Sequence, residues 1–145
     1  MVKKRFPFLK WFFIIALATV VLDQILKYFV LLKNPNWQIN ILNIHLVYNT
    51  GAGFGILQNN TFLLSLISLL VVLAIIVFYR KISPEKLPQI LFALFLGGAV
   101  GNFLDRTFRK TVIDFIDFQF WPAFNIADIA ISAATIGLII YYWKK

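Results

Sequence analysis

The sequence of 145 residues has no cysteine, a single histidine and only six acidic residues. Without cysteine, disulfide bonds, thiol nucleophiles and cysteine-ligated metal sites are excluded. With His45 as the only imidazole, a histidine-based metal site or a Ser-His-Asp triad has little material to work with. We therefore expect neither a metal nor another cofactor, and carboxylates are the main candidates for acid–base chemistry.

Charged residues are also scarce, at 14% of the chain against roughly 25% in ordinary soluble domains. Apolar residues make up 61%, more than one soluble domain of this length can bury. A lipid bilayer resolves this conflict, so we predict a single membrane-embedded domain over residues 1–145. The formal net charge is +8, but the basic residues flank apolar runs, which is typical of topology-setting charges and not of a nucleic-acid partner.

Four apolar runs, each near the ~20 residues that a helix needs to cross a bilayer, divide the chain. Their approximate bounds are 11–32, 62–79, 88–104 and 124–143, with longer connections at 33–61 and 105–123. Because a spanning segment must satisfy its own backbone hydrogen bonds, we predict an all-α membrane protein with four transmembrane helices. The first run is expected to stay a span and not to be a cleaved signal peptide, because apolar residues continue past its Ala-Leu-Ala triplet.

Basic residues cluster at the N-terminal flank, in the loop near 80–87 and in the C-terminal tail. Since cytoplasmic loops are rich in Lys and Arg, both termini are predicted to be cytoplasmic and the two longer connections to lie outside. In the first connection, branched and aromatic residues at 39–41 and 44–48 predict a small extracytoplasmic β-cradle. For the second connection we predict a short helix or loop.

Five of the six acidic residues fall in the outer half of this arrangement, and Asp23 and Asp128 lie within predicted spans. A charge in hydrocarbon costs at least ~2.5–3.5 kcal/mol, so each needs a partner or a function. Asp23 and Lys27 are one helical turn apart, which suits either a self-neutralising pair with Lys27 extended toward the surface, or support of a polar site. Asp114 and Asp128 are joined by a short, turn-containing segment and could share one water molecule for general acid–base chemistry.

Other polar and glycine residues near the predicted outer face are open to simpler interpretations. Residues 49–55 by themselves favour a turn, and Gly97 and Gly101 have the spacing of tightly packed helices. Arg106 lies one turn after Asn102 and could pair with Asp105, or hold a catalytic carboxylate or a substrate carbonyl.

Five segments together resemble the lipoprotein signal peptidases, also called signal peptidase II, a family of aspartic peptidases of bacterial inner membranes. They are Asp23 with Lys27, and residues 49–54, 97–106, 112–115 and 124–128. They occur in the family's order and span most of the chain. Gly53 departs from the alanine that the family usually has, and Asp117 is a second acid to which we assign no role.

The resemblance implies an endopeptidase that cleaves diacylglyceryl-modified prolipoproteins just before the lipidated cysteine, with its active site near the outer leaflet of the inner membrane. It matches Asp114 and Asp128 with the catalytic pair. It also implies contact with membrane lipids and inhibition by globomycin-type cyclic peptides. Substrate-binding or supporting roles are implied for Asp23, Lys27, Asn49, Gly51, Asn102, Arg106 and Asn125.

Two other functions fit parts of the sequence. Intramembrane acids often mark proton paths, so a small proton-coupled transporter is one alternative. Against it, the acids gather on one side and the second apolar run has no ionisable residue. The other alternative is a non-catalytic assembly protein, in which Asn at positions 114 and 128 would affect stability alone. We favour the peptidase over both.

Overall fold

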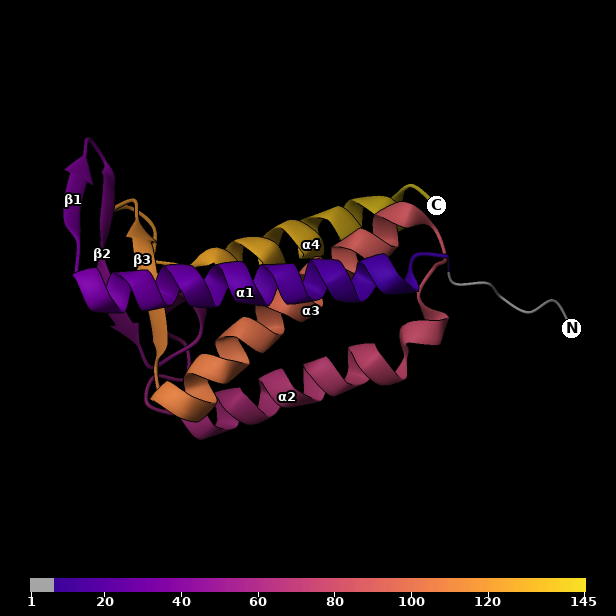
Figure 1. Ribbon diagram of the computed structural model, residues 1–145, viewed down its shortest axis with the longest axis horizontal. Helices are drawn as coiled ribbons and strands as arrows, with labels where there is room; N and C mark the ends of the chain where they lie inside the picture. Colours follow the sequence, from indigo (N-terminus) through magenta and orange to yellow (C-terminus); the bar gives the residue numbers. More distant parts are fainter. Residues whose placement is uncertain (1–6) are drawn as a thin grey trace, which may run out of the picture.

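The computed structural model describes residues 7–145 as a helical bundle with a small sheet at one end (Figure 1). The helices are α1 (Leu9–Lys33), α2 (Thr61–Val77), α3 (Lys86–Leu104) and α4 (Ile126–Trp143). The antiparallel sheet has the order β1 (Asn36–Ile39), β2 (Leu42–Asn49) and β3 (Val112–Asp117). The short turns are η1 (Gly53–Gly55), η2 (Tyr79–Lys81) and the π-helical η3 (Asp105–Arg109), which continues α3. The mostly helical architecture with a small sheet confirms the prediction from sequence.

Within residues 7–145, three segments are long and apolar enough to cross a membrane, namely α1, the 24 residues from Lys86 to Arg109, and α4. Helix α2 is a shorter apolar helix of 17 residues. Large apolar side chains point outward from the bundle, among them Leu17, Leu70 and Ile139, each more than half exposed. A continuous exposed apolar surface of this kind is stable in lipid and not in water. The chain is therefore a membrane protein, as its composition predicted.

The two ends of the bundle differ in character. The sheet lies where α1 ends, whereas the start of α1, the α2–α3 connection and the C-terminus lie at the opposite end (Figure 1). That opposite end carries the basic residues of the η2 region and of the C-terminal tail. Lys3, Lys4 and Arg5, which also entered the predicted orientation, lie outside the described residues.

Helix α3 lies at the centre of the bundle and packs against each of the other three helices. Its glycines permit this, because helices in lipid associate through close packing and not through hydrophobic burial. A Cβ added at Gly97 would lie 2.7 Å from the Ala16 carbonyl oxygen on α1. A Cβ added at Gly98 would lie 2.5 Å from the Ala127 carbonyl oxygen on α4. A Cβ added at Gly101 would lie 3.3 Å from the Ala127 Cβ, so the packing role predicted for Gly97 and Gly101 is confirmed.

The sheet differs from its prediction in two ways. The first strand ends at Ile39, and Asn40 occupies the turn with a φ of 53°, a left-handed conformation that asparagine tolerates. The second connection contains the short helical segment η3, and it also contributes the strand β3, which was not predicted and which pairs with β2 so that Asp114 lies opposite Val47. The first four residues of β3 are all buried, so neither face of the strand is set aside for polar residues. Its sequence therefore lacks the polar–apolar alternation by which a half-buried strand is recognised.

We expect Gly98→Ala to lower the apparent unfolding temperature in detergent, because overpacking a closely packed position costs about 1–3 kcal/mol and the opposing atom is a backbone carbonyl. Gly53→Ala is the matched control, since a Cβ there would have nothing within 4 Å. Thermal unfolding followed by tryptophan fluorescence compares the two, and equal unfolding temperatures would contradict the close α3–α4 contact.

Candidate active site

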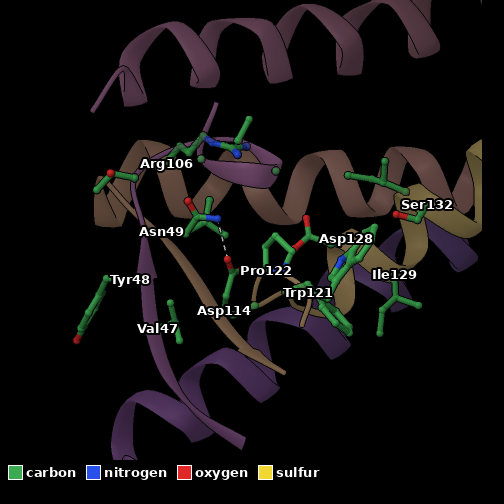
Figure 2. Close-up of a pocket in the computed structure, with 18 of the residues that line it drawn as sticks. Val47, Tyr48, Asn49, Arg106, Asp114, Trp121, Pro122, Asp128, Ile129 and Ser132 are labelled. Carbon is green, nitrogen blue, oxygen red and sulfur yellow. Dashed lines mark hydrogen bonds between the residues drawn. The ribbon is translucent and has the colours of Figure 1, made fainter. Parts of the chain in front are cut away.

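A cavity of about 810 Å³ opens at the sheet end of the bundle (Figure 2). Four polar residues of the predicted site line it, namely Asn49, Arg106, Asp114 and Asp128. They come from β2, η3, β3 and α4 respectively, so four separate elements converge on one space. In Figure 2, the side chains of Asn49 and Asp114 point toward one another, and Asp128 is among the other labelled residues that line the cavity.

Asp114 is held at the centre of β3 with its side chain completely buried. The Asn49 amide donates a hydrogen bond to Oδ2 over 2.8 Å, and the Asn125 amide donates to Oδ1 over 2.7 Å. Burial, reinforced by the charge of Asp128, raises the pKa of Asp114 to about 7, although the two amide hydrogen bonds oppose this shift. Asp114 is thus a carboxyl group that can hold a proton near neutral pH.

Asp128 is fixed by the way in which α4 begins. Asn125 is the N-cap residue, and its side-chain oxygen accepts from the Asp128 backbone N–H over 3.0 Å. In return Asp128 Oδ2 accepts from the Asn125 backbone N–H over 3.1 Å, which completes a capping box. The Asn102 amide donates to the other oxygen, Oδ1, over 2.8 Å. Both carboxylate oxygens of Asp128 therefore have assigned partners.

Asn125 joins the two carboxylates. Its side-chain amide donates to Asp114, and its backbone N–H donates to Asp128. The chain returns from β3 to this residue through a bridge in which the Phe124 N–H donates to the Ile116 carbonyl oxygen over 3.0 Å. The short connection therefore brings Asp114 and Asp128 to one cavity, as its length suggested.

Lys27 is completely buried and turned toward the interior of the bundle. Its Nζ lies 2.8 Å from Asp23 and 2.8 Å from Asp105, and it donates to Asn102 Oδ1 over 3.1 Å. The alternative in which Lys27 extends toward the membrane surface is therefore wrong. The suggested pairing of Asp105 with Arg106 is wrong as well, because Asp105 pairs with Lys27 and Arg109.

Arg106 connects the end of α3 to the segment that follows β2. Its guanidinium donates to Ser68 Oγ over 3.3 Å and to the Gly51 carbonyl oxygen over 3.4 Å. The Gly51 N–H in turn donates to Asn49 Oδ1 over 2.9 Å, which orients the amide that reaches Asp114. Both of these partners are neutral, so the positive charge of Arg106 faces the cavity without a direct ion pair to any residue of 7–145.

Asp117 lies outside the cavity lining and interacts with His45 over 3.0 Å. The Gln119 backbone N–H also donates to it over 2.7 Å, and these hydrogen bonds lower the pKa of Asp117. Sequence reasoning overlooked Asp105 as a site residue, together with Gln24, whose amide donates to Asp105 Oδ1 over 3.2 Å. The spacing of Asp105 and Arg109, one helical turn, was the available signal. Among residues 7–145, no group of three or more His, Asp or Glu is placed to hold a metal ion.

This arrangement offers two carboxylates from different elements, each oriented by amides and facing one space. One protonated and one ionised carboxyl group can act as general acid and general base on a water molecule placed between substrate and protein. The apolar part of the lining, including Ile129 and Ile136 of α4, would keep such a site poor in bulk water.

The chain is similar to known proteins over nearly its whole length. The family model described as signal peptidase (SPase) II matches residues 15–144. A lipoprotein signal peptidase of Moorella thermoacetica is 38% identical over 139 residues, covering 92% of this chain and 91% of that protein. One of Geobacillus kaustophilus is 41% identical over 138 residues, covering 88% of each.

Solved structures show the same likeness. A bacterial membrane enzyme determined by the in meso method at 2.3 Å resolution superposes with a TM-score of 0.88 at 30% identity, covering 94% of this chain and 90% of that chain. A second, at 1.9 Å resolution, gives a TM-score of 0.84 at 30% identity, covering 95% and 96%. The structural likeness thus covers nearly the whole chain.

We expect the apparent unfolding temperature to fall as the pH rises from about 4 to 7. Asp114 in the native state keeps its proton to about pH 7, whereas an unfolded aspartate loses it at about pH 3.9. The native state therefore binds more protons between these two pH values, and raising the pH favours unfolding. Asp114→Asn should reduce this decline. Asp117→Asn should preserve it, and identical slopes for the two variants would contradict the raised pKa of Asp114.

Proposed function

This chain belongs to the signal peptidase II family, whose members remove signal peptides from prolipoproteins, and we propose that it does so as an aspartic endopeptidase. The proposed catalytic pair is Asp114 and Asp128. One observation carries the assignment: these two carboxylates, from a strand and a helix, line the same cavity and are joined through Asn125.

In the proposed reaction the pair shares one proton near neutral pH. The ionised carboxylate takes a proton from water, and the resulting hydroxide attacks the scissile carbonyl carbon. The protonated carboxyl donates its proton to the carbonyl oxygen, which gives a neutral tetrahedral intermediate. When the C–N bond breaks, the amine nitrogen takes up a proton from the pair, while a hydroxyl of the intermediate gives its proton back to the pair. The products are a carboxylic acid and an amine, and the pair again holds one shared proton. The raised pKa of Asp114 supports this proposal.

The supporting residues take distinct roles in this proposal. Asn49 and Asn125 orient Asp114, and Asn102 orients Asp128. We assign Arg106 to binding a peptide carbonyl of the substrate, because its guanidinium lines the cavity and has only long contacts to neutral oxygens. Gly51 supports this group by accepting from Arg106 and fixing Asn49.

The proposed substrate is a prolipoprotein with a diacylglyceryl-modified cysteine, cleaved just before that cysteine. A substrate of this kind stays in the bilayer, so the enzyme must meet it there while water still reaches the peptide bond. The cavity suits both requirements, because its polar residues lie at the sheet end and its wall continues along α4 through Ile129, Ala133 and Ile136. These three residues share one face of the helix, and together they offer an apolar surface to acyl chains.

For the membrane arrangement we propose that α2 spans the membrane in addition to the three longer segments, which gives four spans. Its 17 residues fall within the range of roughly 17–25 that spanning helices show. The basic end would face the cytoplasm of a bacterium, with both termini there, and the sheet and cavity would lie at the outer leaflet of the inner membrane. Contact with membrane lipids and inhibition by globomycin-type peptides belong to the same proposal. Family membership gives no support to the transporter alternative.

We predict that Asp114→Asn and Asp128→Asn each lower kcat for a synthetic diacylglyceryl peptide by at least about 10²-fold, the minimum expected when a general acid or base is removed. Asp117→Asn is the matched control and should keep near-normal turnover, because Asp117 lies outside the cavity lining. Mass spectrometry of the products, on variants that elute as folded monodisperse protein, measures the effect. Near-normal turnover in either variant of the pair would remove that residue from the proposal.

The pH profile provides an independent measurement. Because the mechanism needs one proton on the pair, kcat/KM should fall as the pH rises above about 7, where Asp114 loses its proton. The same lipidated peptide, assayed between pH 5 and 9 in buffers of constant ionic strength, gives the profile. A flat profile across the alkaline half of this range would contradict the shared proton.

A further inference from the structure

Asp23 and Asp105 make the same kind of contact to the two halves of the candidate site. Asp23 Oδ1 accepts from the backbone N–H of Ala127 over 2.9 Å, and Ala127 immediately precedes Asp128. Asp105 Oδ2 accepts from the backbone N–H of Ile113 over 3.1 Å, and Ile113 immediately precedes Asp114. Each buried aspartate therefore holds the main chain one residue before one member of the proposed catalytic pair.

Lys27 connects these two aspartates. Its Nζ lies 2.8 Å from Asp23 Oδ2 and 2.8 Å from Asp105 Oδ2, and all three side chains are completely buried. An ammonium group has three donors, and the third goes to Asn102 Oδ1 over 3.1 Å. Because Asn102 in turn donates to Asp128, every donor of Lys27 leads to a group that holds the catalytic pair.

We propose that Asp105 is a positioning residue, and that Lys27, Asp23 and Asp105 form a clamp that sets the separation and orientation of Asp114 and Asp128. The inference rests on the proposed role of that pair. None of the three clamp residues lines the cavity, so they act on the reaction through the backbone at Ile113 and Ala127 and not by touching the substrate.

The composition of the clamp supports positioning over simple stabilisation. Desolvation offsets most of the attraction within a buried ion cluster, and well-packed apolar residues often stabilise a core as well. Hydrogen bonds from N–H groups to an ionised carboxylate, however, are roughly twice as strong as neutral ones, which suits them to holding a backbone segment in place. The charges also balance, since Arg109 pairs with Asp105 at the edge of the cluster and supplies the second cation for the two carboxylates.

The helices around Lys27, Asp23 and Asp105 are packed closely against these three side chains. A Cβ added at Gly101 would lie 2.7 Å from Asp23 Oδ2 and 3.3 Å from the Ala127 Cβ. The Gln24 amide closes another side, with contacts of 3.2 Å to both Asp23 Oδ2 and Asp105 Oδ1. The clamp is therefore enclosed by α1, α3 and the start of α4, where a small displacement of either carboxylate would be transmitted to the site.

Asp105→Ala should lower kcat for the lipidated peptide by about 10²-fold, the loss expected from a misplacement of roughly 1 Å in a catalytic group, and should leave KM nearly unchanged. Asp105→Asn keeps an oxygen for the Ile113 N–H but loses the ion pairs, so its kcat should lie between those of the wild type and the alanine variant. A lowered kcat with an unchanged KM, together with the partial recovery of kcat in Asp105→Asn, identifies Asp105 as a residue that positions the catalytic pair.

Gln89→Leu is the control for lost stability alone. Gln89 is also buried on α3 and hydrogen-bonded, to Tyr79 over 2.7 Å and to the Ser83 carbonyl oxygen over 2.8 Å, but it lies at the opposite end of the helix. Its replacement should lower the unfolding temperature and leave kcat per folded molecule at the wild-type value. If Gln89→Leu lowers kcat as much as the Asp105 variants do, a loss of overall stability explains the lower kcat and the clamp is overturned.

Two further outcomes separate the clamp from the proposed function. If folded Asp105→Ala keeps wild-type kcat while Asp114→Asn is inactive, the clamp is wrong and the catalytic pair stands. If Asp114→Asn and Asp128→Asn are both active, the proposed function fails and the clamp fails with it. Should Asp105→Ala not fold, Asp105→Asn and Asp23→Asn decide the question, since reduced kcat in both supports the clamp and unchanged kcat in either overturns it.

Discussion

A buried ammonium group in a lipid-facing bundle needs counter-charges in direct contact, and the way in which Lys27 obtains them explains how the helices meet and where the site lies. Isolated, this charge would be too costly to bury. With Asp23 on its own helix and Asp105 at the end of α3, both at 2.8 Å, it is paired on two sides. This requirement draws α1 and α3 together near the sheet end of the bundle. The glycines of α3 make that approach possible, because any side chain at Gly101 would enter the space of the Asp23 carboxylate.

The same contacts bring together two parts of the chain with different local structures. Asp114 lies on a strand and Asp128 in the first turn of a helix, so neither element alone brings the carboxylates close. Asn125 links these two elements, since its side-chain oxygen caps α4 and its side-chain amide donates to Asp114 on β3. A polar site built in this way can lie where the membrane-spanning helices meet the sheet. That location reconciles a lipid-bound substrate with access to water, which the proposed hydrolysis requires.

A carboxyl group that is buried so that it keeps a proton near neutral pH lowers the stability of the folded protein once it ionises. Burial and a neighbouring negative charge raise the pKa of Asp114 to about 7, so ionising it in the folded protein is costly. Close packing elsewhere offsets this cost, for example where Phe12, Ala93 and Leu96 form part of the buried core between α1 and α3. Asp117, only three residues along the same strand, is partly exposed and paired with His45, and its pKa is lowered instead. The local environment, and not the residue type, therefore distinguishes the two acids.

Composition and hydropathy are enough to predict the membrane character and the four helices, whose bounds lie within two residues of the predicted ones. Hydropathy and charge placement are local properties, and a spanning helix satisfies its own backbone, so no distant contact is needed to recognise it. The candidate residues were also visible, because their motifs are continuous in sequence. Three features became visible only in the folded chain: Lys27 points inward, Asp105 is its partner, and residues 112–117 form a third strand. Those features depend on pairings between distant segments, such as the Asp23–Ala127 hydrogen bond across 104 residues, and no local pattern encodes such a contact.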